Sequence, residues 1–357
     1  MAGQTLEGTS TGKRPTIDDV ARLSGVGRAT VSRVLNDGPN VSDKMRSRVL
    51  EAVETLGYQV NLQARFLAGG ANRTVLLIFS SDTESEPNSY YQAALETGAL
   101  RVCAQTGFEL VTHSVVQSGA DVETRILHLV EESRCRGVIL TPPFSDWSNL
   151  VRLLTEAGTA LVRISPGSSE DPGAPGVGMD DEAAGFALAR HLLDLGHRRV
   201  GFIQGLAEHL SAERRFLGAM RAFKEEGLDE NAIVSRRGNF TFKSGTDLLP
   251  ELIATDPRPT AIICANDDTA VGALFAAHRD GLDVPRDLSI ASFDDTPVSA
   301  LVWPPLTTVH QPIQEMSARA MQIIAGAGGS GGVAPQSCEL LPFTIVERAS
   351  VASPARR

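Results

Sequence analysis

The chain has 357 residues, of which 42% are hydrophobic and 21% are charged, and its formal net charge is −10. This composition is typical of an ordinary globular protein, and the length suits a small domain together with one or two larger ones. No run of about 18 apolar residues occurs, which excludes the usual pattern of a membrane-spanning helix. Residues 1–14 lack the apolar stretch of a secretory signal, so we expect a disordered arm there.

The charge is distributed unevenly along the chain. Residues 13–73 hold ten Lys or Arg and six Asp or Glu, an excess of four positive charges, which leaves fourteen negative charges for the rest. A basic segment attracts phosphates, whereas an acidic remainder is repelled by them. This distribution favours nucleic acid as a partner of the N-terminal segment, although the net charge of the whole chain does not.

Four cysteines are spread through the chain and lie in or beside apolar runs. They are Cys103, Cys135, Cys264 and Cys338. No CxxC pair or Cys/His cluster accompanies them, so the sequence predicts neither a zinc site nor a disulfide framework. We expect buried thiols in a reducing cytoplasm, and a cytoplasmic protein that needs no metal and no cofactor.

Residues 16–36 predict two short helices joined by a tight turn. Thr16 followed by Asp19 forms a start that resembles a capping box, and Gly25 can adopt the positive φ with which a helix ends. The second helix begins near Arg28 and leaves that side chain facing outward. Arginine can hydrogen-bond guanine edges bidentately, and this pattern predicts a helix-turn-helix that reads the major groove. The alternative is a helical hairpin with a solvated basic face.

A third helix is expected at about 43–56, after the turn residues at 36–40. Ser42 is its expected N-cap, and Gly57 is expected to end it. Lys44 in the first turn lies near backbone N–H groups that have no helical partner, which suits a phosphate contact. Three helices of this size make a domain of roughly 45 residues that is marginally stable by itself.

The fixed spacings in residues 16–70 resemble the DNA-binding headpiece and hinge of the lactose-repressor (LacI) family of bacterial transcription regulators. The matching stretches are T-I-D-D-V-A, S-G-V, A-T-V-S-R-V-L-N, V-S-D-K-M-R-S-R-V, L-G-Y and N-x-x-A-R-x-L. The resemblance implies a headpiece at 15–59 and a hinge helix or linker at 60–71. Gly27-Arg28 replaces the Ser plus another residue found in many relatives, so the operator of a relative cannot be assumed for this chain.

The resemblance also implies which side chains contact DNA. In the headpiece these are Thr16, Arg28, Ala29, Thr30, Ser32, Arg33, Asn36, Ser42, Lys44 and Tyr58. In the hinge they are Asn61, Ala64, Arg65 and Leu67. Leu67 corresponds to the leucine that wedges between central base pairs from the minor groove, which unstacks them and bends the duplex. Taken alone, Leu67 could equally be a linker residue that packs on the body.

From residue 73 onward, apolar strands alternate with helices. Helices are expected at about 89–105, 121–133 and 146–157, and after a turn-rich stretch at about 181–195, 212–227, 244–255 and 268–280. This alternation predicts two α/β lobes with parallel, doubly wound sheets. Ligands of such sheets bind beyond the carboxyl ends of the strands. The polar residues at those ends are Ser80, Ser165, Asn266, Asp267 and Asp294.

The body resembles the sensor domain of the LacI family, which is similar to periplasmic sugar-binding proteins. The segments concerned are D-D-E-A-A-G, L-G-H-R-R-V, R-x-x-G, A-N-D-D-T-A-V-G-A, F-D-D, P-P-L-T-T-V-x-Q and L-P-F-T-I-V-E-R. The resemblance implies an effector-binding and dimerisation domain at 72–349, with a tail at 350–357. Lobe 1 would span about 72–173 and 311–330, and lobe 2 about 174–310 and 331–349.

The resemblance further implies which side chains bind the effector. They are Tyr90, Tyr91, Arg163, Ser165, Ser211, Arg215, Phe240, Asn266, Asp267, Asp294 and Gln311. Asp, Asn and Arg suit vicinal hydroxyls, and an aromatic face suits the apolar side of a pyranose, so we expect a mono- or disaccharide. Each of these residues also has a structural alternative. Arg215 could form a salt bridge without contacting the ligand, Asn266 and Asp267 could cap a helix, and Gln311 could belong to the hinge between the lobes. His197 is expected to be structural.

The sequence argues against an enzyme. It contains no GxxxxGK[ST], no GxGxxG after a strand, no HExxH and no GxSxG. Adjacent aspartates at 180–181 and 294–295 lack a second set of ligands, and such pairs after strands are common loop caps. A sugar-binding transport component without a DNA function is the alternative from another class.

We therefore predict a ligand-responsive repressor of carbohydrate uptake and catabolism genes. It would bind a pseudo-palindromic operator as a homodimer, because one headpiece reads only a half-site. The segment after residue 348 lacks the leucine heptads of a tetramerising helix. The Gly-rich stretch at 326–336 is expected to be a flexible surface loop.

Overall fold

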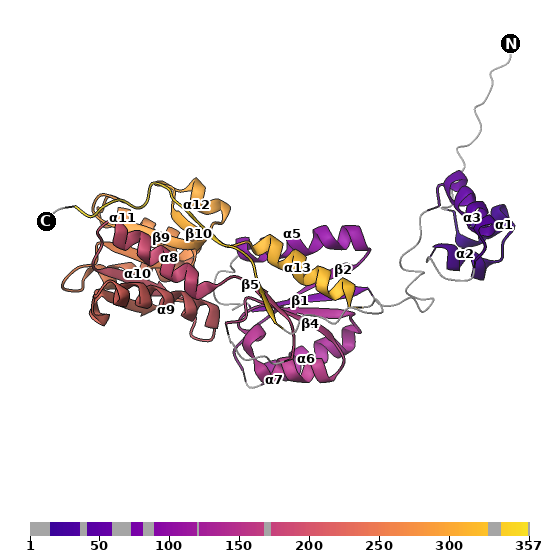
Figure 1. Cartoon of the computed structure of the whole chain (residues 1–357), viewed down its shortest axis with the longest axis horizontal. Helices are drawn as coiled ribbons and strands as arrows, with labels where there is room; N and C mark the ends of the chain where they lie inside the picture. Colours follow the sequence, from indigo (N-terminus) through magenta and orange to yellow (C-terminus); the bar gives the residue numbers. More distant parts are fainter. Residues whose placement is uncertain are drawn as a thin grey trace, which may run out of the picture. The chain divides into compact units, whose positions relative to one another are not determined.

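The computed structural model describes residues 15–35, 41–58, 73–80, 89–119, 121–167, 173–327 and 337–355. The chain divides into two compact units, Met1–Asn72 and Arg73–Arg357, which Figure 1 shows in the colours of the sequence. Several predictions lie outside the described residues. They concern the arm at 1–14, Asn36, the hinge with Asn61, Ala64, Arg65 and Leu67, and most of the loop at 326–336.

The described part of the first unit is the predicted set of three helices. They are α1 (Ile17–Ser24), α2 (Arg28–Leu35) and α3 (Asp43–Leu56). The backbone N–H of Thr16 donates to Asp19 Oδ2 at 2.9 Å, and that of Asp19 donates to Thr16 Oγ1 at 3.4 Å, so the capping box is confirmed. Gly25 ends α1 with a φ of 63°, as expected. Buried valines and one alanine form the core between the helices: Val20, Val31, Val34, Val49 and Ala52.

Ser42 departs from its predicted role. It precedes α3 in an extended conformation, but its side chain makes no capping hydrogen bond. The N–H groups of Met45 and Arg46 instead donate to the backbone carbonyl of Ser42. The start of α3 is therefore held by backbone bonds, and the hydroxyl of Ser42 is exposed.

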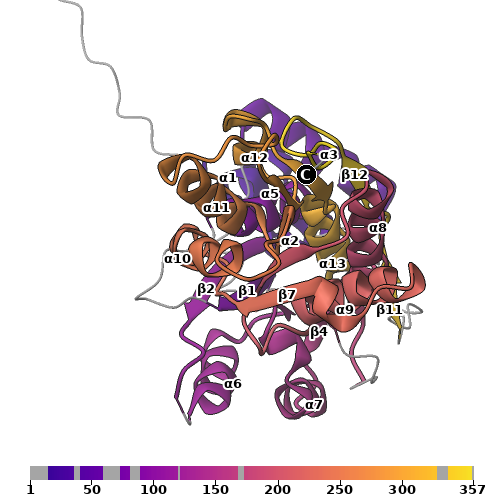
Figure 2. The ribbon, with the colours of Figure 1, turned by 90° about the vertical axis from the view of Figure 1, so that its left-hand side faces the viewer.

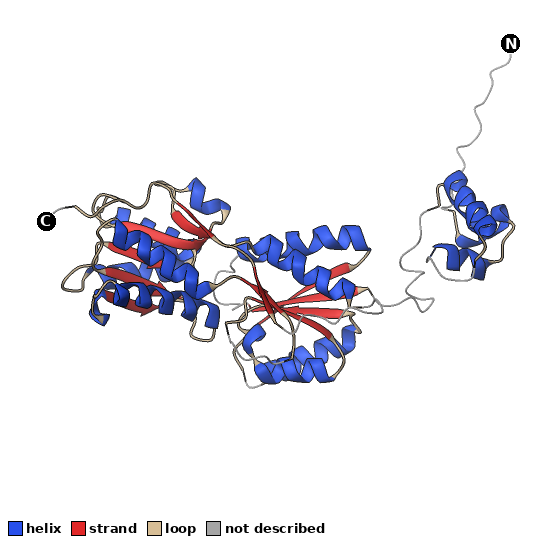
Figure 3. Ribbon diagram, viewed as in Figure 1, coloured by secondary structure: helices blue, strands red, loops and turns tan. Residues whose placement is uncertain are grey.

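The second unit contains two α/β lobes, each built on a six-stranded sheet. The sheet of lobe 1 has the order β11-β5-β4-β3-β1-β2, and all its neighbouring strands are parallel. Its strands are β1 (Thr74–Ser80), β2 (Glu109–Val115), β3 (Gly137–Leu140), β4 (Ala160–Ile164), β5 (Gly176–Gly178) and β11 (Cys338–Leu340). Helices α5 (Ser89–Thr106) and α13 (Ile313–Gly326) cover one face, and α6 (Val122–Ser133) and α7 (Ser148–Glu156) cover the other (Figure 3).

The sheet of lobe 2 has the order β12-β10-β9-β8-β6-β7, with β12 antiparallel to β10 and the other pairs parallel. Its strands are β6 (Val200–Gln204), β7 (Ile233–Arg237), β8 (Ala261–Cys264), β9 (Ser289–Asp294), β10 (Thr307–His310) and β12 (Thr344–Val346). Helices α8 (Asp181–Asp194) and α9 (Leu210–Glu225) pack on one face, and α10 (Phe242–Ile253) and α11 (Asp267–Arg279) on the other. The short α12 (Pro297–Leu301) follows β9 and lies beside α11 (Figure 2).

The predicted lobe boundaries need correction at two short strands. Residues 176–178 and 338–340 were predicted in lobe 2, but β5 pairs with β4 and β11 pairs with β5 in the sheet of lobe 1. The lobe boundary was predicted at the turn-rich stretch that ends before residue 176. The chain leaves lobe 1 only after β5, which follows that stretch, so composition misplaces the crossover. The predicted tail also differs, because Ser350 is buried and Ala352 donates its N–H to Ser289 Oγ at 3.1 Å.

Helices α8 and α9 approach each other closely at two glycines. A Cβ added to Gly185 of α8 would lie 1.9 Å from the carbonyl oxygen of Arg215, and one added to Gly218 of α9 would lie 1.9 Å from that of Glu182. Only glycine permits this approach. It brings Arg215 beside Asp181 at the start of α8.

Gly185→Ala should therefore destabilise the body. The added methyl group has to push the α9 backbone away, and overpacking of this kind costs about 1–3 kcal/mol of the free energy of unfolding. Gly326→Ala is the matched control, because no described residue outside its own helix backbone and chain neighbours has an atom within 4 Å of the added Cβ. Urea denaturation of both variants measures the effect. Equal midpoints for the two variants would show that the α8–α9 approach is not tight.

Candidate ligand site and nucleic-acid interface

A cavity of about 240 Å³ lies at the carboxyl ends of the strands of both lobes. Lobe 1 contributes residues at or just after the ends of β1 to β4 and residues of α5. Lobe 2 contributes residues at or after the ends of β6 to β9 and residues of α9. Gln311 completes the lining from the segment between β10 and α13. The rule that ligands bind beyond the carboxyl ends of parallel strands thus predicts the place of the cavity correctly. Its volume, just below the ~300–1,000 Å³ typical of ligand pockets, suits a small ligand.

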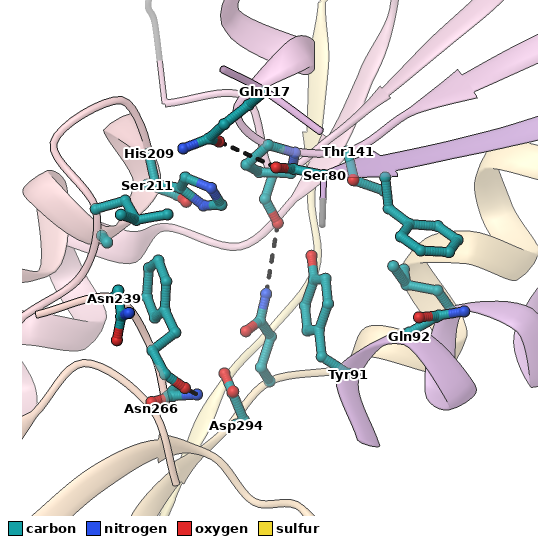
Figure 4. A pocket seen from close by; sticks show the side chains of 18 of the residues that line it. Ser80, Tyr91, Gln92, Gln117, Thr141, His209, Ser211, Asn239, Asn266 and Asp294 are labelled. Atoms are coloured by element: carbon teal, nitrogen blue, oxygen red, sulfur yellow. Dashed lines mark hydrogen bonds between the residues drawn. The ribbon is translucent and has the colours of Figure 1, made fainter. Parts of the chain in front are cut away.

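The structure brings most of the predicted effector residues together in this cavity. Those that line it are Tyr91, Ser165, Ser211, Arg215, Phe240, Asn266, Asp294 and Gln311. Several of them face one another across the cavity in Figure 4, with Tyr91 on one side and Ser211 on the other. Asn266 is in addition the N-cap of α11, because its side chain accepts from the N–H of Thr269 at 3.1 Å. Its amide nitrogen donates to the carbonyl of Phe240 at 3.0 Å.

Three predicted residues do not line the cavity: Tyr90, Arg163 and Asp267. Tyr90 is 41% exposed, because successive residues of a helix point about 100° apart and Tyr91 faces inward. Arg163 is buried within β4, and its Nε donates to the carbonyl of Ala174 at 3.2 Å. The side chain of Tyr90 therefore points to solvent and that of Arg163 binds the backbone, and neither direction can be derived from the position of the residue in the sequence.

Asp267 is a buried carboxylate that holds the start of α11 against the sheet. Its oxygens accept hydrogen bonds from the hydroxyl groups of Ser292, Thr296 and Thr308, and from the N–H of Thr296 at 2.7 Å. These donors take up the carboxylate, so Asp267 supports the site from behind. The structural alternative for this residue, a contact at the helix start, describes it better than ligand contact.

Arg215 lies at the centre of the site and is buried. Its Nε donates to Asp181 Oδ1 at 2.8 Å, and its Nη1 donates to the carbonyl of Ala265 at 2.9 Å and lies 3.5 Å from Asp294 Oδ1. Its Nη2 donates to Gln311 Oε1 at 2.9 Å. The amide of Gln311 in turn donates to Ser165 Oγ at 3.4 Å. Arg215 thus connects lobe 2, the crossover and lobe 1 through one chain of hydrogen bonds.

Burial shifts the protonation equilibria of the site. Loss of water raises the pKa of Asp294 to about 7, although the nearby Arg215 acts in the opposite direction. Burial also raises the pKa of Asp181, against the same arginine. Burial and then the positive charge of Arg215 lower the pKa of His209 to about 4. His209 is therefore neutral at physiological pH, whereas Asp294 titrates within the physiological range.

The backbone is strained around the cavity. Among the described residues other than glycine, positive φ values occur at Ser165 (44°), Phe240 (66°), Asp294 (107°) and Asp295 (55°), and far from the site at Arg134 (48°). Three of these residues line the cavity. Such conformations cost of order 1–3 kcal/mol each and cluster where side chains must be aimed at a ligand.

The affinity for a ligand should fall as the pH is lowered from 8 to 6. Hydroxyl donors of a ligand favour the ionised carboxylate of Asp294, whose pKa burial raises to about 7. Below that value binding has to displace a proton, so the dissociation constant should rise by up to about tenfold per pH unit. Calorimetric titrations with a sugar found by screening would measure this, and Asp294→Asn should flatten the profile. A pH-independent affinity in the unmodified protein would contradict a ligand contact at Asp294.

Several lining residues were missed from the sequence. They include Gln92, Gln117, Thr141, His209 and Asn239. Three of them could have been predicted from the strand ends, because Gln117, Thr141 and Asn239 lie within two residues after the ends of β2, β3 and β7. Gln92 lies one helical position after Tyr91, and His209 precedes α9, so only the folded chain places them in the cavity (Figure 4).

The candidate DNA interface lies on the first unit. The structure leaves Thr16, Arg28, Ala29, Arg33, Ser42 and Lys44 exposed, and it half-buries Thr30, Ser32 and Tyr58. Arg28 makes an exposed ion pair with Asp18 at 3.5 Å, which is weak enough to be exchanged for a partner on DNA. Tyr58 packs against the core of the three helices.

The first unit is a helix-turn-helix head whose helix α2 begins with an exposed arginine. The second unit is a two-lobed body around a polar cavity. Together they define the class of DNA-binding proteins that are controlled by a small ligand.

The comparisons with known proteins agree with this class. Residues 16–61 match the family described as bacterial regulatory proteins, lacI family, and residues 189–351 match the periplasmic binding protein-like domain. The HTH-type transcriptional regulator GalR of Escherichia coli (strain K12) is 32% identical over 346 residues, which is 95% of this chain and 96% of that protein.

Catabolite control protein A of Priestia megaterium is 32% identical over 310 residues, or 87% of this chain and 91% of that protein. The chain therefore belongs to the lacI family of bacterial regulatory proteins. It is a DNA-binding transcriptional regulator that responds to a small-molecule effector, and it is not an enzyme. The predictions of a ligand-responsive DNA-binding regulator and of a protein that is not an enzyme are confirmed. Family membership argues against the alternative of a sugar-binding transport component.

Solved structures support the same conclusion about the fold. The Lac repressor dimer bound to operator and the anti-inducer ONPF has a TM-score of 0.75 and 26% identity, over 95% of this chain and 100% of that chain. The complex of the transcriptional regulator CelR with cellobiose has a TM-score of 0.69 and 27% identity, over 94% and 100% of the two chains. The predicted fold class is confirmed. None of the helices described here has the length and apolar character needed to cross a membrane.

Proposed function

We propose that this regulator represses genes of carbohydrate uptake and catabolism, and that a mono- or disaccharide sets its affinity for a pseudo-palindromic operator. The observation that carries the proposal is the cavity itself. Amide and hydroxyl groups surround one buried arginine and one carboxylate, with the aromatic ring of Phe240 in the same wall. Hydroxyl-rich rings need both donors and acceptors together with an aromatic surface. The CelR structure was solved with cellobiose, which is a sugar of this kind.

The DNA contacts are proposed from the same family. Arg28 and Ala29 at the start of α2 would meet base edges, and Lys44 at the start of α3 would meet a phosphate. The hinge residues proposed to reach the minor groove are Asn61, Ala64, Arg65 and Leu67. A ligand that contacts both lobes favours one arrangement of the lobes over the other, which changes the spacing of the two hinges in a dimer and so the affinity for the operator.

A homodimer is proposed because lobe 2 exposes large apolar side chains where a second copy can cover them. Leu301 at the end of α12 is 78% exposed, Trp303 is 81% exposed, and Phe275 on the neighbouring α11 is 53% exposed. Leu301 and Trp303 are the most exposed large apolar side chains among the described residues, and a cluster of such surface marks an interaction site. The related Lac repressor was solved as a dimer on its operator.

Trp303→Glu should convert the dimer into a monomer. A buried charge without a partner at the centre of an interface costs several kcal/mol, and a dimer in the micromolar range would then dissociate. Leu217→Glu is the control, since this residue is also exposed but lies on α9, on the opposite face of the lobe 2 sheet from α11. Sedimentation velocity distinguishes the two. A dimer that survives Trp303→Glu would place the interface elsewhere.

The proposal as a whole is tested by a gel-shift experiment with DNA from upstream of the gene itself, combined with a thermal-shift screen of sugars. A binder raises the melting temperature by mass action. We expect one retarded duplex and at least one sugar that both stabilises the protein and changes the retardation. Retardation that no sugar alters would refute the carbohydrate effector, and the absence of any retarded duplex would refute the regulation of nearby genes.

A further inference from the structure

We infer that the cavity selects an uncharged, polyhydroxylated ligand and rejects the phosphorylated form of the same sugar. This inference rests on the proposed function, because it names the chemical class of that same effector. It depends on four features of the lining: the surroundings of its arginine, the state of its histidine, the neutrality of its other polar groups and the position of Asp294.

Arg215 is the single Lys or Arg side chain among the described residues that line the cavity. Two carboxylates, those of Asp181 and Asp294, already lie within 4 Å of its guanidinium. The guanidinium also donates hydrogen bonds to the Ala265 carbonyl and to Gln311. A phosphate would have to compete with these acceptors for the guanidinium, and displacing a carboxylate would leave a buried negative charge without its partner.

His209 does not supply a second positive charge to the cavity. Burial and the nearby Arg215 lower the pKa of its imidazole to about 4, so the ring is neutral at physiological pH. Its Nε2 is shielded from solvent and has no hydrogen-bond partner in the part of the chain that the structure describes. The ring packs against Phe240 with 5.0 Å between centroids.

An unpaired buried nitrogen beside a cavity indicates a contact with the ligand, because an unsatisfied polar atom costs about 1–3 kcal/mol. A sugar hydroxyl can satisfy either tautomer of His209, since a hydroxyl both donates and accepts. A phosphate dianion offers acceptors alone. The aromatic pair of His209 and Phe240 also gives the flat face of a sugar ring a surface to lie on.

The other polar groups of the lining are neutral amides and hydroxyls. They include Tyr91, Gln92, Thr141, Asn239 and Asn266. Ser80 and Gln117 are joined by a hydrogen bond of 3.0 Å, which Figure 4 shows at the lobe 1 side of the cavity. Such groups match hydroxyls on a ring, but they do not balance two negative charges.

The test compares matched pairs of ligands by calorimetry at pH 8, where Asp294 is ionised. The probes are D-glucose and glucose 6-phosphate, D-galactose and galactose 1-phosphate, D-ribose and ribose 5-phosphate, and D-fructose and fructose 6-phosphate, with cellobiose as a larger neutral sugar. Like charges brought together in a site cost several kcal/mol. We therefore expect each phosphate ester to bind at least about 100-fold more weakly than the neutral sugar of a pair that binds.

Asp294→Asn provides a second readout. It removes the negative charge that opposes a phosphate but also weakens hydroxyl binding, so the measured quantity is the ratio of the two affinities. This ratio should move at least about tenfold toward the ester. Asp121→Asn, an exposed carboxylate at the start of α6, should leave the ratio unchanged.

The outcomes are distinguishable. A phosphate ester that binds as tightly as its neutral sugar, or more tightly, overturns the selection for uncharged ligands but leaves sugar-responsive regulation intact. An unchanged ratio in Asp294→Asn overturns the electrostatic explanation of the selection. If none of the neutral sugars, none of the phosphate esters and no cellobiose binds, the proposed carbohydrate effector and this inference fail together.

Discussion

Replacing Arg215 with alanine should abolish the response to the effector and lower the free energy of unfolding of the body by about 3–5 kcal/mol. The guanidinium neutralises Asp181 at 2.8 Å and lies 3.5 Å from Asp294, and all three side chains are buried. Its loss leaves two buried carboxylates near each other and breaks the bond to Gln311 that connects the lobes. Urea denaturation measures the stability, and operator titrations with and without sugar measure the response.

Arg221→Ala is the matched control, because this residue lies on the same helix but is half exposed and pairs with Glu182 outside the cavity. It should cost less than about 1 kcal/mol. The headpiece belongs to a separate compact unit, so Arg215→Ala should still bind operator at a temperature where the body is folded. A normal sugar response in Arg215→Ala would contradict the central role of this residue, and lost operator binding in a fully folded variant would contradict the separation of the two units.

Arg28→Ala should weaken operator binding more than any other single change in the headpiece. The side chain is exposed at the start of α2, the position from which a recognition helix reads base edges. A bidentate contact with guanine contributes about 1–3 kcal/mol. The proposed dimer would lose this contact in both half-sites, so we expect a loss of about 2–6 kcal/mol in operator affinity. Fluorescence anisotropy with a labelled operator measures it.

The control for this prediction removes the same charge from the body. Arg101 is exposed on α5, and Arg101→Ala should leave operator affinity within about threefold of the unmodified value. Binding to random DNA separates base reading from phosphate attraction, because a base contact is lost on the operator alone. A uniform loss on operator and random DNA would assign Arg28 to a phosphate.

The secondary structure was largely accessible from the sequence, because periodicity in short helices and buried strands is strong. The predicted helix at 43–56 matches α3, and those at 89–105 and 181–195 differ from α5 and α8 by one residue. Prediction fails where an element is too short for a period. β5 and β11 have three residues each, and their membership of lobe 1 depends on pairing with distant strands.

The candidate site was accessible to a lesser degree. Strand ends pointed correctly to Ser165, Asn266 and Asp294, because the topology of a parallel sheet brings its carboxyl ends together. The direction of a side chain depends on tertiary packing, so Asp267 was predicted in the cavity although hydroxyl groups from β9 and β10 bind it from behind. His209 has no local signal at all. Its proposed role follows from the fact that its Nε2 has no hydrogen-bond partner among the described residues, which only the folded chain reveals.

The two units of the chain have complementary tasks in this account. The head supplies exposed positive charge at the start of a recognition helix, and the body supplies a polar cavity whose central arginine connects both lobes and the crossover between them. Coupling between the two sites requires that the ligand and the operator favour different arrangements of the same body. By thermodynamic necessity, this coupling acts equally in both directions.

The most direct test of this coupling is a closed thermodynamic cycle on the unmodified protein. It compares the operator dissociation constant with and without a saturating sugar, and the dissociation constant of that sugar with and without operator. We expect two equal ratios that differ from one by at least about fivefold. Two ratios of one, for a sugar shown to bind in the cavity and an operator shown to bind the head, would contradict it.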